Sequence, residues 1–395
     1  MKIDKNTIVK PLAVLVLYVF IQVYPSWIKV SSSKSGRDFA SFYYAQKVSW
    51  SGGNPYDARQ LSRLSRKEKT RKNVHPFFYP PPSLLLFSWA QPFSLHTAYM
   101  ISFFINHTIV AGLFILLRNW LKISSILLAL LFALCTPISD CIMMGQINLV
   151  ILILIVWGVQ KQRGSFLAGA AMVKMSPALI LWPQIIWRKW HFVGWTIAFA
   201  VIFSVIFLPF MGFEQQKSFY TDVLPQFSSG QYSGLKVPIH LSSNHSIPEF
   251  CAQWFPAEKG TRISVEAQRF SSLITIGFLS FLSWLAWKTK SETKILGAFI
   301  VLMVLIPIYT YEHHLVFLLL PSAILLGIQK EHTRFFSICS YGTLFFLFWP
   351  LAWWKEAQKI FPAGKWMIQE SKMFAALILM GLLCYSALIS KERAD

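Results

Sequence analysis

An acidic residue beside a glycine and an aromatic stretch is the first candidate for chemistry. Asp38 follows Gly36 and Arg37, about ten residues after the first long apolar run. A carboxylate at the mouth of a helical bundle can act as a general base toward a substrate hydroxyl. Aspartate also caps helices, and residues 39–50 read as a short amphipathic helix. On this segment alone, the cap is the favoured interpretation.

A single cation interrupts a long apolar stretch. Lys174 is the only charged residue between Arg163 and Arg188. A cation at membrane depth is costly and therefore points to function, and an anionic partner such as a phosphate would suit it. The alternative is a side chain that extends from a helix end to the membrane surface.

Polar side chains also gather where other apolar runs begin. Gln146 and Asn148 open an aliphatic helix, where carboxamides either bind substrate hydroxyls or link neighbouring helices. Tyr79 precedes a triple proline in an aromatic segment, a composition that is ordinary at a membrane interface. Both features are weak as isolated signals of a site.

Two histidine-containing segments lie between apolar runs. Glu312 precedes the adjacent His313 and His314, and adjacent residues of a helix point to different faces, so we expect at most one histidine to face a common site. Zinc prefers a histidine pair at i,i+4 and further ligands, so we predict no metal site. Residues 244–246 also fit a glycosylation pattern that is common by chance.

The elements that must position these residues are membrane helices. Hydrophobic residues make up 55% of the chain and charged residues 14%, against about a quarter charged in soluble domains. Runs long enough to cross about 30 Å of hydrocarbon recur along the chain. They cover residues 8–28, 97–117, 123–141, 192–211, 270–287, 295–311, 315–328, 335–354 and 373–389, with a shorter run at 146–158. We predict an all-α polytopic membrane protein with about 10–12 spans.

Basic residues orient these spans, because short loops rich in Lys and Arg stay in the cytoplasm. Placing all such loops inside gives ten spans and cytoplasmic termini. Residues 165–187 then form a re-entrant pair bent near Pro177, since proline and the residue before it disfavour helix. Residues 80–92 become a partial insertion from outside. Twelve spans are the alternative, which would expose the basic residues of 118–122 and 161–163 outside.

This topology divides a single membrane domain, residues 1–395, into five parts. They are a first span at 8–28, an outer loop at 29–76, helices and re-entrant segments at 77–211, a second outer loop at 212–265 and C-terminal spans at 266–390. The polar candidates then fall near the outer face, which predicts a site there beside short amphipathic helices.

The first outer loop is strongly basic. Residues 29–75 hold eleven Lys and Arg against three acidic residues. Long loops cross the membrane largely regardless of charge, and a basic loop suits anionic lipid head groups or phosphates. A solvated basic helix over residues 59–72 is the equally weighted alternative.

Seven segments in order resemble glycosyltransferase family 87, the polyprenol-phosphate-mannose-dependent α-1,2-mannosyltransferases and related arabinofuranosyltransferases of the GT-C fold. They are Asp38-Phe39 with Tyr43-Tyr44-Ala45, Gly52-Gly53-Asn54-Pro55-Tyr56-Asp57, Phe78-Tyr79-Pro80-Pro81, Gly145-Gln146-Ile147-Asn148, Ala168-Gly169 with Lys174 and Ser176-Pro177, Asn244-His245-Ser246, and Glu312-His313-His314. The chain departs from the family in a short C-terminal end and in His245, where we expect glutamine.

The resemblance implies an inverting transferase at the outer, periplasmic face of a bacterial inner membrane. Its donor would be a polyprenyl-phosphate sugar, most simply mannose, and its acceptor a lipid or glycan. Asp38 corresponds to the catalytic acid of the family. For the donor phosphate we expect Lys174, Arg37, His314 and His313. For substrate contacts we expect Tyr79, Gln146, Asn148, Asn244, His245 and Glu312.

No P-loop, dinucleotide fingerprint or zinc-type spacing occurs in the sequence. We therefore expect no cofactor, no metal and no nucleic-acid partner, with membrane lipids as the surroundings. A transporter or lipid flippase is the rival class, although its usual inverted repeats are not visible. A non-catalytic assembly partner is a third possibility, and it would tolerate loss of Asp38.

Overall fold

The computed structural model describes residues 5–32, 36–229, 239, 241, 243–257 and 263–389. Every regular element in these residues is helical, which confirms the predicted all-α class. In the first half of the chain the helices are α1 (Lys5–Tyr18), α2 (Tyr24–Ser31), α3 (Arg37–Trp50), α4 (Ala58–Lys67), α5 (Leu95–Leu121), α6 (Ser125–Leu134), α7 (Pro137–Met144), α8 (Asn148–Gln160), α9 (Gly164–Val173) and α10 (Leu181–Ile186).

In the second half they are α11 (Trp190–Met211), α12 (Phe213–Ser218), α13 (Leu224–Ser228), α14 (Ile247–Trp254), α15 (Val265–Lys288), α16 (Glu292–Leu305), α17 (Leu319–Gly327), α18 (Arg334–Phe348), α19 (Leu351–Ile360) and α20 (Lys365–Ile389). Short 3₁₀ helices are η2 (Pro81–Ala90), η3 (Ser176–Ile180), η5 (Glu312–Leu318), η6 (Gln329–Glu331) and η7 (Pro362–Gly364). The π-helical turns are η1 (Val19–Val23) and η4 (Phe219–Val223).

Six of the described helices are long and apolar enough to cross a membrane, and the number rises to eight if two bent pairs each count as a span. The bent pairs are Ser125–Leu134 with Pro137–Met144, at 51°, and Arg334–Phe348 with Ala352–Ile360, at 95°. The described residues therefore contain fewer candidate spans than the ten predicted. The apolar runs at 146–158 and 295–311 form helices of only 13 and 14 residues. The first helix ends before the polar turn that begins at Lys161, and the second ends two residues before Pro307.

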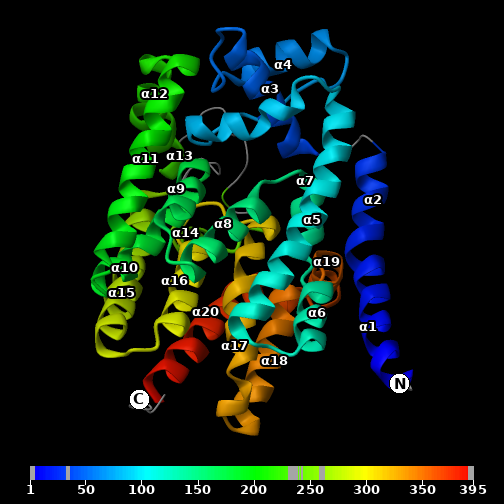
Figure 1. Ribbon diagram of the computed structural model, residues 1–395, viewed down its shortest axis with the longest axis vertical. Coiled ribbons are helices and arrows are strands. Elements are labelled where there is room, and N and C mark those ends of the chain that lie inside the picture. Colours follow the sequence, from blue (N-terminus) through cyan, green and yellow to red (C-terminus); the bar gives the residue numbers. More distant parts are fainter. Residues whose placement is uncertain are drawn as a thin grey trace.

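The long helices stand side by side, with one end of the bundle covered (Figure 1). The α1–α2 rod and α5 lie on one side and α11 and α15 on the other, while α3 and α4 lie across the top. The beginning of α1 and the end of α20 both lie at the opposite end from α4.

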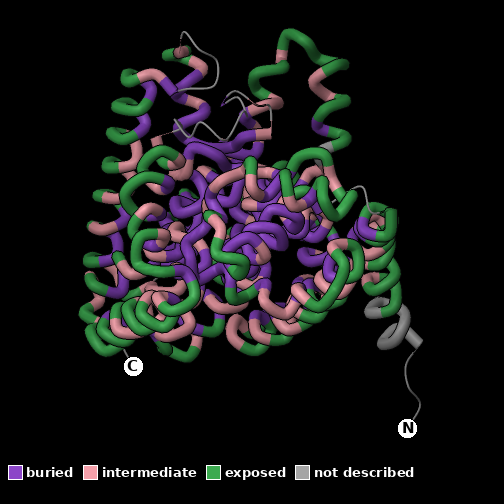
Figure 2. Tube along the Cα trace, turned by 90° about the horizontal axis from the view of Figure 1, so that it is seen from above, coloured by how far each residue is buried: buried purple, intermediate pink, exposed green. Residues whose placement is uncertain are grey.

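Burial is concentrated at the centre, and the surrounding helices expose their outer sides (Figure 2). In α11 and α15 only 22% of the most apolar window is buried, yet the exposed side chains are apolar, among them Ile197, Val205 and Leu273. Since an apolar helix surface is stable in hydrocarbon and costly in water, these helices form the lipid-facing wall.

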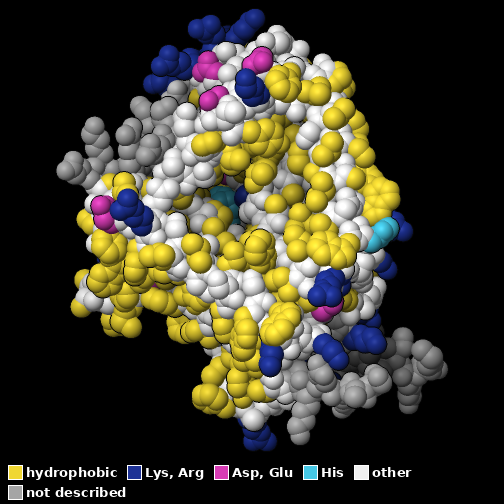
Figure 3. Space-filling model, turned by 90° about the vertical axis from the view of Figure 1, so that its left-hand side faces the viewer, with side chains coloured by type: hydrophobic (Ala, Val, Ile, Leu, Met, Phe, Trp, Pro, Cys, Tyr) yellow, Lys and Arg dark blue, Asp and Glu magenta, His cyan; other side chains and the backbone are white. Residues whose placement is uncertain are grey.

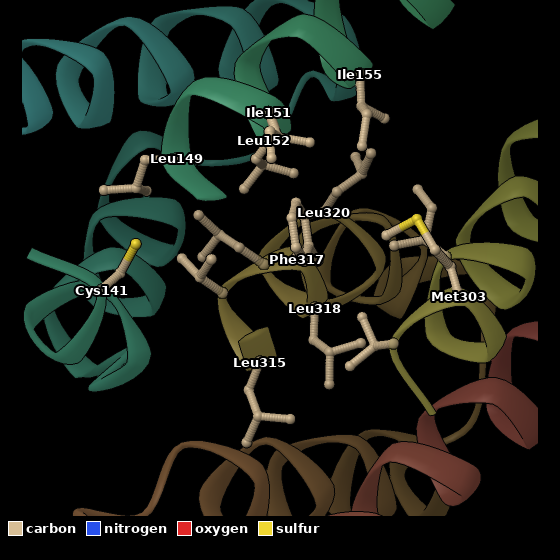
Figure 4. Packing of buried hydrophobic residues seen from close by; sticks show 14 of the residues in the cluster. Cys141, Leu149, Ile151, Leu152, Ile155, Met303, Leu315, Phe317, Leu318 and Leu320 are labelled. Atoms are coloured by element: carbon tan, nitrogen blue, oxygen red, sulfur yellow. The ribbon is translucent and has the colours of Figure 1, made fainter. Parts of the chain in front are cut away.

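The core lies beneath the top layer, around α16. All residues from Ile295 to Leu305 are buried, so this helix is apolar on every side, as expected for a central helix. Side chains of α7, α8, α16, η5 and α17 meet there, including Leu152, Met303 and Phe317 (Figure 4). The packed core fixes η5 against α7 and α8.

Proline breaks the helices where the sequence predicts. α9 ends at Val173, Lys174 is extended, and η3 begins at Ser176 with Pro177 in its first turn. The segment after Pro80 forms η2 instead of a long helix. Both short segments pack against neighbouring helices, because η2 contacts α3, α9 and α11 while η3 contacts α16.

Two left-handed glycines bring α3 and α7 together. Gly36 has φ of 79° and donates its N–H to the carbonyl of Met143 at 3.0 Å. Gly145 has φ of 70°, and a Cβ built there would lie 2.3 Å from the Cβ of Phe39. Glycine is required at such positions because it tolerates positive φ and leaves room for the neighbouring chain.

Gly145→Ala is expected to destabilise the protein by about 2–4 kcal/mol, from left-handed strain and from overpacking against Phe39. The measurement is the midpoint of thermal unfolding in detergent micelles. Gly342→Ala is the matched control, since nothing lies within 4 Å of a Cβ at Gly342. Equal midpoints for the two variants would contradict the close approach of α3 and the α7–α8 turn.

Candidate active site

Asp38 lies in the first turn of α3 but does not cap it. The N-cap is Gly36, with no side-chain cap. The carboxylate points instead across to the α7–α8 turn, where its Oδ2 accepts a hydrogen bond of 2.7 Å from Gln146 Nε2. The capping interpretation, favoured on the segment alone, is therefore wrong, and the carboxylate is partly exposed beside a polar partner.

Gln146 and Tyr79 continue this chain of hydrogen bonds. The Tyr79 hydroxyl donates to Gln146 Oε1 at 3.0 Å, and the Tyr56 hydroxyl donates to the Tyr79 carbonyl at 3.1 Å. Burial first, and then the charge of Asp38, raise the pKa of Tyr79 well above its ordinary value. Tyr79 therefore remains a hydroxyl donor, which orients the Gln146 amide toward Asp38.

Lys174 lies at the break between α9 and η3, beside Tyr79. Its Nζ donates to Asn148 Oδ1 at 3.0 Å and lies 5.9 Å from the centroid of the Tyr79 ring and 5.8 Å from that of Phe317. Asn148 Nδ2 donates in turn to the His313 carbonyl at 2.9 Å. Among the contacts described for Lys174 there is no carboxylate. Burial lowers the pKa of Lys174 to about 7, so an anionic ligand would stabilise its charged form.

The two histidines of η5 take different directions, as predicted. His314 Nδ1 accepts the Tyr311 N–H at 3.1 Å and so caps η5. His313 Nδ1 lies 3.5 Å from Asp140 Oδ2. The structure thus brings together Asp38, Gln146, Tyr79, Asn148 and Lys174, with His313 and His314 at the border of this group.

A hollow opens in the face of the molecule that carries α11 and α12 (Figure 3). Hydrophobic side chains surround the hollow, and a histidine and a basic side chain are visible inside it. An apolar rim with a few polar groups at depth is the usual composition of a small-molecule site. A lateral opening also suits a ligand that arrives from the lipid.

Arg37 has a different set of contacts from Lys174. Its Nη2 contacts Nε2 of His75, and both residues line a cavity that faces α4. Burial first, and then the charge of Arg37, lower the pKa of His75 to about 4, so neutral His75 accepts the hydrogen bond from Arg37. No contact between Arg37 and Lys174 is described: Arg37 lies with His75 at this cavity, and Lys174 lies with Asn148 and Tyr79.

Glu312 and His245 belong to a second, fully buried polar cluster. Glu312 Oε1 pairs with Lys372 Nζ, and Glu312 Oε2 lies 3.5 Å from His245 Nε2. Burial lowers the pKa of His245, which keeps the ring neutral. These contacts tie η5 to α20 and occupy two side chains predicted to bind substrate.

Asn244 serves the same junction. Its Nδ2 donates to the Ile308 carbonyl at 2.8 Å, and its Oδ1 accepts the Thr310 N–H at 2.8 Å. All three residues are buried, so the amide replaces backbone hydrogen bonds that an irregular segment lacks. Asn244, His245 and Glu312, predicted as substrate contacts, thus hold the loop before η5 in place.

Sequence reasoning missed Lys372 and a neighbouring pair of carboxyl groups. Gln253 Nε2 lies 2.9 Å from Glu249 Oε2 and 2.6 Å from Glu370 Oε1, and both glutamates are fully buried. Burial first, and then the charge of Glu370, raise the pKa of Glu249 to about 9. The i,i+4 spacing of Glu249 and Gln253 was the available sequence signal.

Glu249→Gln is expected to flatten the pH dependence of stability. The folded pKa of about 9 exceeds the ordinary 4.5, so the folded state holds a proton that the unfolded state releases, and stability falls as pH rises from 4.5 to 9. The variant mimics the protonated carboxyl and should gain on the order of 2 kcal/mol at pH 8. The measurement is the melting midpoint at pH 5.5 and at pH 8.5, and Glu356→Gln, at an exposed glutamate, is the control. An equal change of midpoint with pH in the native chain and in Glu249→Gln would refute the prediction.

In the part of the chain that the structure describes, no group of three or more His, Cys, Asp or Glu side chains is placed to hold a metal ion. The groups that could take part in a reaction are thus the carboxylate of Asp38, the amides of Gln146 and Asn148, the Tyr79 hydroxyl and the amine of Lys174. Together they present a proton acceptor, neutral hydrogen-bonding groups and one partly buried amine that an anion would hold in its charged form.

Comparison with known proteins gives the family. The model of glycosyltransferase family 87 matches residues 77–309, which include Tyr79, Gln146, Asn148 and Lys174. Asp38 and the 312–314 segment lie outside the matched range. No curated protein and no solved structure matched the chain. Because the match covers more than half of its length, this membrane protein belongs to glycosyltransferase family 87.

Proposed function

We propose that the protein transfers a sugar, most simply mannose, from a polyprenyl-phosphate donor to an acceptor hydroxyl. Family membership supplies the glycosyl transfer. The observation that carries the donor class is Lys174, a partly buried cation close to the rings of Tyr79 and Phe317 with no carboxylate among its described contacts. A lipid phosphate brings both an anion for the lysine and a hydrocarbon chain for the membrane.

The reaction is a single displacement with inversion. The acceptor oxygen attacks the anomeric carbon, the bond from that carbon to the phosphate oxygen breaks, and its electron pair stays on the phosphate. Asp38 Oδ1 receives the hydroxyl proton, since Oδ2 is held by Gln146. Lys174 stabilises the added negative charge of the leaving phosphate, so no proton donor is required there.

We place the site at the outer face of the membrane. The beginning of α1, the end of α20 and the basic α15–α16 turn lie at the end of the molecule opposite α4 (Figure 1). Short basic loops favour the cytoplasm, so the end that carries Asp38 faces outward. In a bacterial inner membrane this side is the periplasm, where lipid-linked sugars replace nucleotide sugars as donors.

Lys174→Met is expected to weaken donor binding by roughly 10- to 100-fold, the equivalent of one hydrogen bond to a charged group. The measurement is the equilibrium affinity for a short-chain polyprenyl-phosphate mannose in detergent micelles. Methionine keeps the length of the side chain and removes its charge, so packing against Phe317 is preserved.

Lys161→Met is the matched control, because Lys161 is an exposed lysine in the turn after α8. Its affinity should equal that of the native chain. Native affinity in Lys174→Met, with the protein folded by its melting midpoint, would remove Lys174 from the phosphate role. A lost affinity in both variants would indicate a general effect of charge.

A further inference from the structure

A basic cavity lies on the other side of Asp38, between α3 and α4. It has a volume of about 570 Å³ and is lined by four arginines: Arg37 of α3, Arg59 and Arg66 of α4, and Arg71 of the segment that follows. Ser62 and His75 add polar groups. Among the described residues that line the cavity there is no acidic side chain.

One face of α4 lines this cavity. Arg59, Ser62 and Arg66 stand at positions i, i+3 and i+7, which share one face of a helix. All four basic residues of α4 are exposed, but Arg63 and Lys67 do not line the cavity. Some of the basic side chains that gather at this end of the molecule therefore line the cavity, and others do not (Figure 3).

The arginines are held close together in spite of their like charges. Arg37 contacts His75, and Arg66 Nη1 donates to the Lys72 carbonyl at 3.1 Å. Burial is the main cause that lowers the pKa of half-buried Arg71; the charge of Arg37 adds to it, while Tyr99, Tyr44 and Asp38 oppose it. An anion in the cavity would offset the repulsion between these like charges, and guanidinium groups match phosphate oxygens with paired hydrogen bonds.

The position of the cavity relates it to the acceptor. Arg37 and Asp38 are consecutive residues, with Arg37 lining the cavity and Asp38 bonded to Gln146. A phosphate in the cavity and a hydroxyl at Asp38 are thus within reach of one molecule. Lys174, on the far side of Gln146 and Tyr79, is left for the phosphate of the donor.

We propose that the arginine cavity binds a phosphate group of the acceptor, so that the acceptor is a phosphate-bearing lipid or glycan. The assignment to the acceptor rests on the glycosyl transfer proposed above. Phosphate binding itself is independent of it and is measured without turnover.

The test compares two double variants of the full-length protein in neutral detergent micelles. Arg59→Gln with Arg66→Gln removes two charges from the cavity, and Arg63→Gln with Lys67→Gln removes two charges from the exposed side of the same helix. Calorimetry measures binding of dioctanoyl phosphatidic acid, glycerol phosphate, uncharged dioctanoylglycerol and a short-chain polyprenyl phosphate.

The cavity double variant is expected to lose at least about tenfold in affinity for dioctanoyl phosphatidic acid, while the control pair changes it by less than about twofold. Dioctanoylglycerol should not bind the cavity. Equal binding of glycerol phosphate would support the cavity and assign a water-soluble phosphate, whereas much weaker binding would assign a lipid head group.

Three results would overturn the proposal. One is no binding of either phosphate probe to the native chain. Another is an equal loss in both double variants, which would indicate general surface charge. The third is a loss confined to polyprenyl phosphate, which would assign the cavity to the donor. None of these results depends on sugar transfer, so the donor and turnover experiments judge the proposed reaction separately.

Discussion

Asp38→Asn is expected to lower kcat for sugar transfer by roughly 10²- to 10⁴-fold, the range for loss of a general base, with donor affinity kept within about a factor of three. Asparagine has the size of aspartate, and its Oδ1 accepts the hydrogen bond that Gln146 Nε2 gives to Asp38 at 2.7 Å. The variant therefore removes the proton acceptor and retains the local structure.

The kinetic pattern distinguishes chemistry from folding. Asp222→Asn is the matched control, since Asp222 is an exposed carboxylate of η4, and it should turn over like the native chain. Single-turnover rates and donor affinities are measured for all three proteins. Near-native turnover in Asp38→Asn would exclude Asp38 as the base, while a loss of donor binding would assign it a structural role.

Lys372→Met is expected to have the largest effect on stability, about 3–5 kcal/mol, because it leaves the carboxylate of Glu312 buried without a cation. Both side chains are almost completely buried, with 0% and 4% of their surfaces exposed. The pair joins α20 to η5, so its loss should loosen the element that carries His313 and His314. Unfolding midpoints in detergent measure the effect.

A double variant separates the buried charge from the shape of the side chains. Glu312→Gln combined with Lys372→Met removes both charges and should recover most of the lost stability, since two neutral groups carry little desolvation cost. Lys365→Met, an exposed lysine at the beginning of the same helix, should match the native chain. If Lys372→Met also matched it, the ion pair would have no role in stability.

Local signals predicted much of the scaffold. Proline at 177 and the glycine-rich turn at 52–55 act through neighbouring backbone atoms, so the break before η3, the end of α3 and the beginning of α4 follow from the sequence. The start of α8 at Asn148 could likewise be predicted from the neighbouring residues. The number of spans was overestimated because an apolar run at 295–311 fits both a full span and the short, buried α16.

The contacts that the sequence did not predict join residues that are far apart in the chain. Lys372 precedes an apolar run and resembles any lysine at a helix end, and only the fold brings it to Glu312, sixty residues away. Asn244 looks the same in sequence whether it binds a sugar or the backbone of Thr310. Gln146 and Lys174 were identified because polar groups at membrane depth are rare, but their link through Tyr79 required the structure.

The most direct test of the central claim is the choice of donor. Purified protein in lipid vesicles is given radiolabelled mannose either on polyprenyl phosphate or on a nucleotide diphosphate, with a phosphate-bearing lipid as acceptor, and labelled product is counted. The account predicts product from the polyprenyl-phosphate donor alone, with the anomeric configuration inverted. Product from the nucleotide donor alone, with the lipid donor inert, would contradict it.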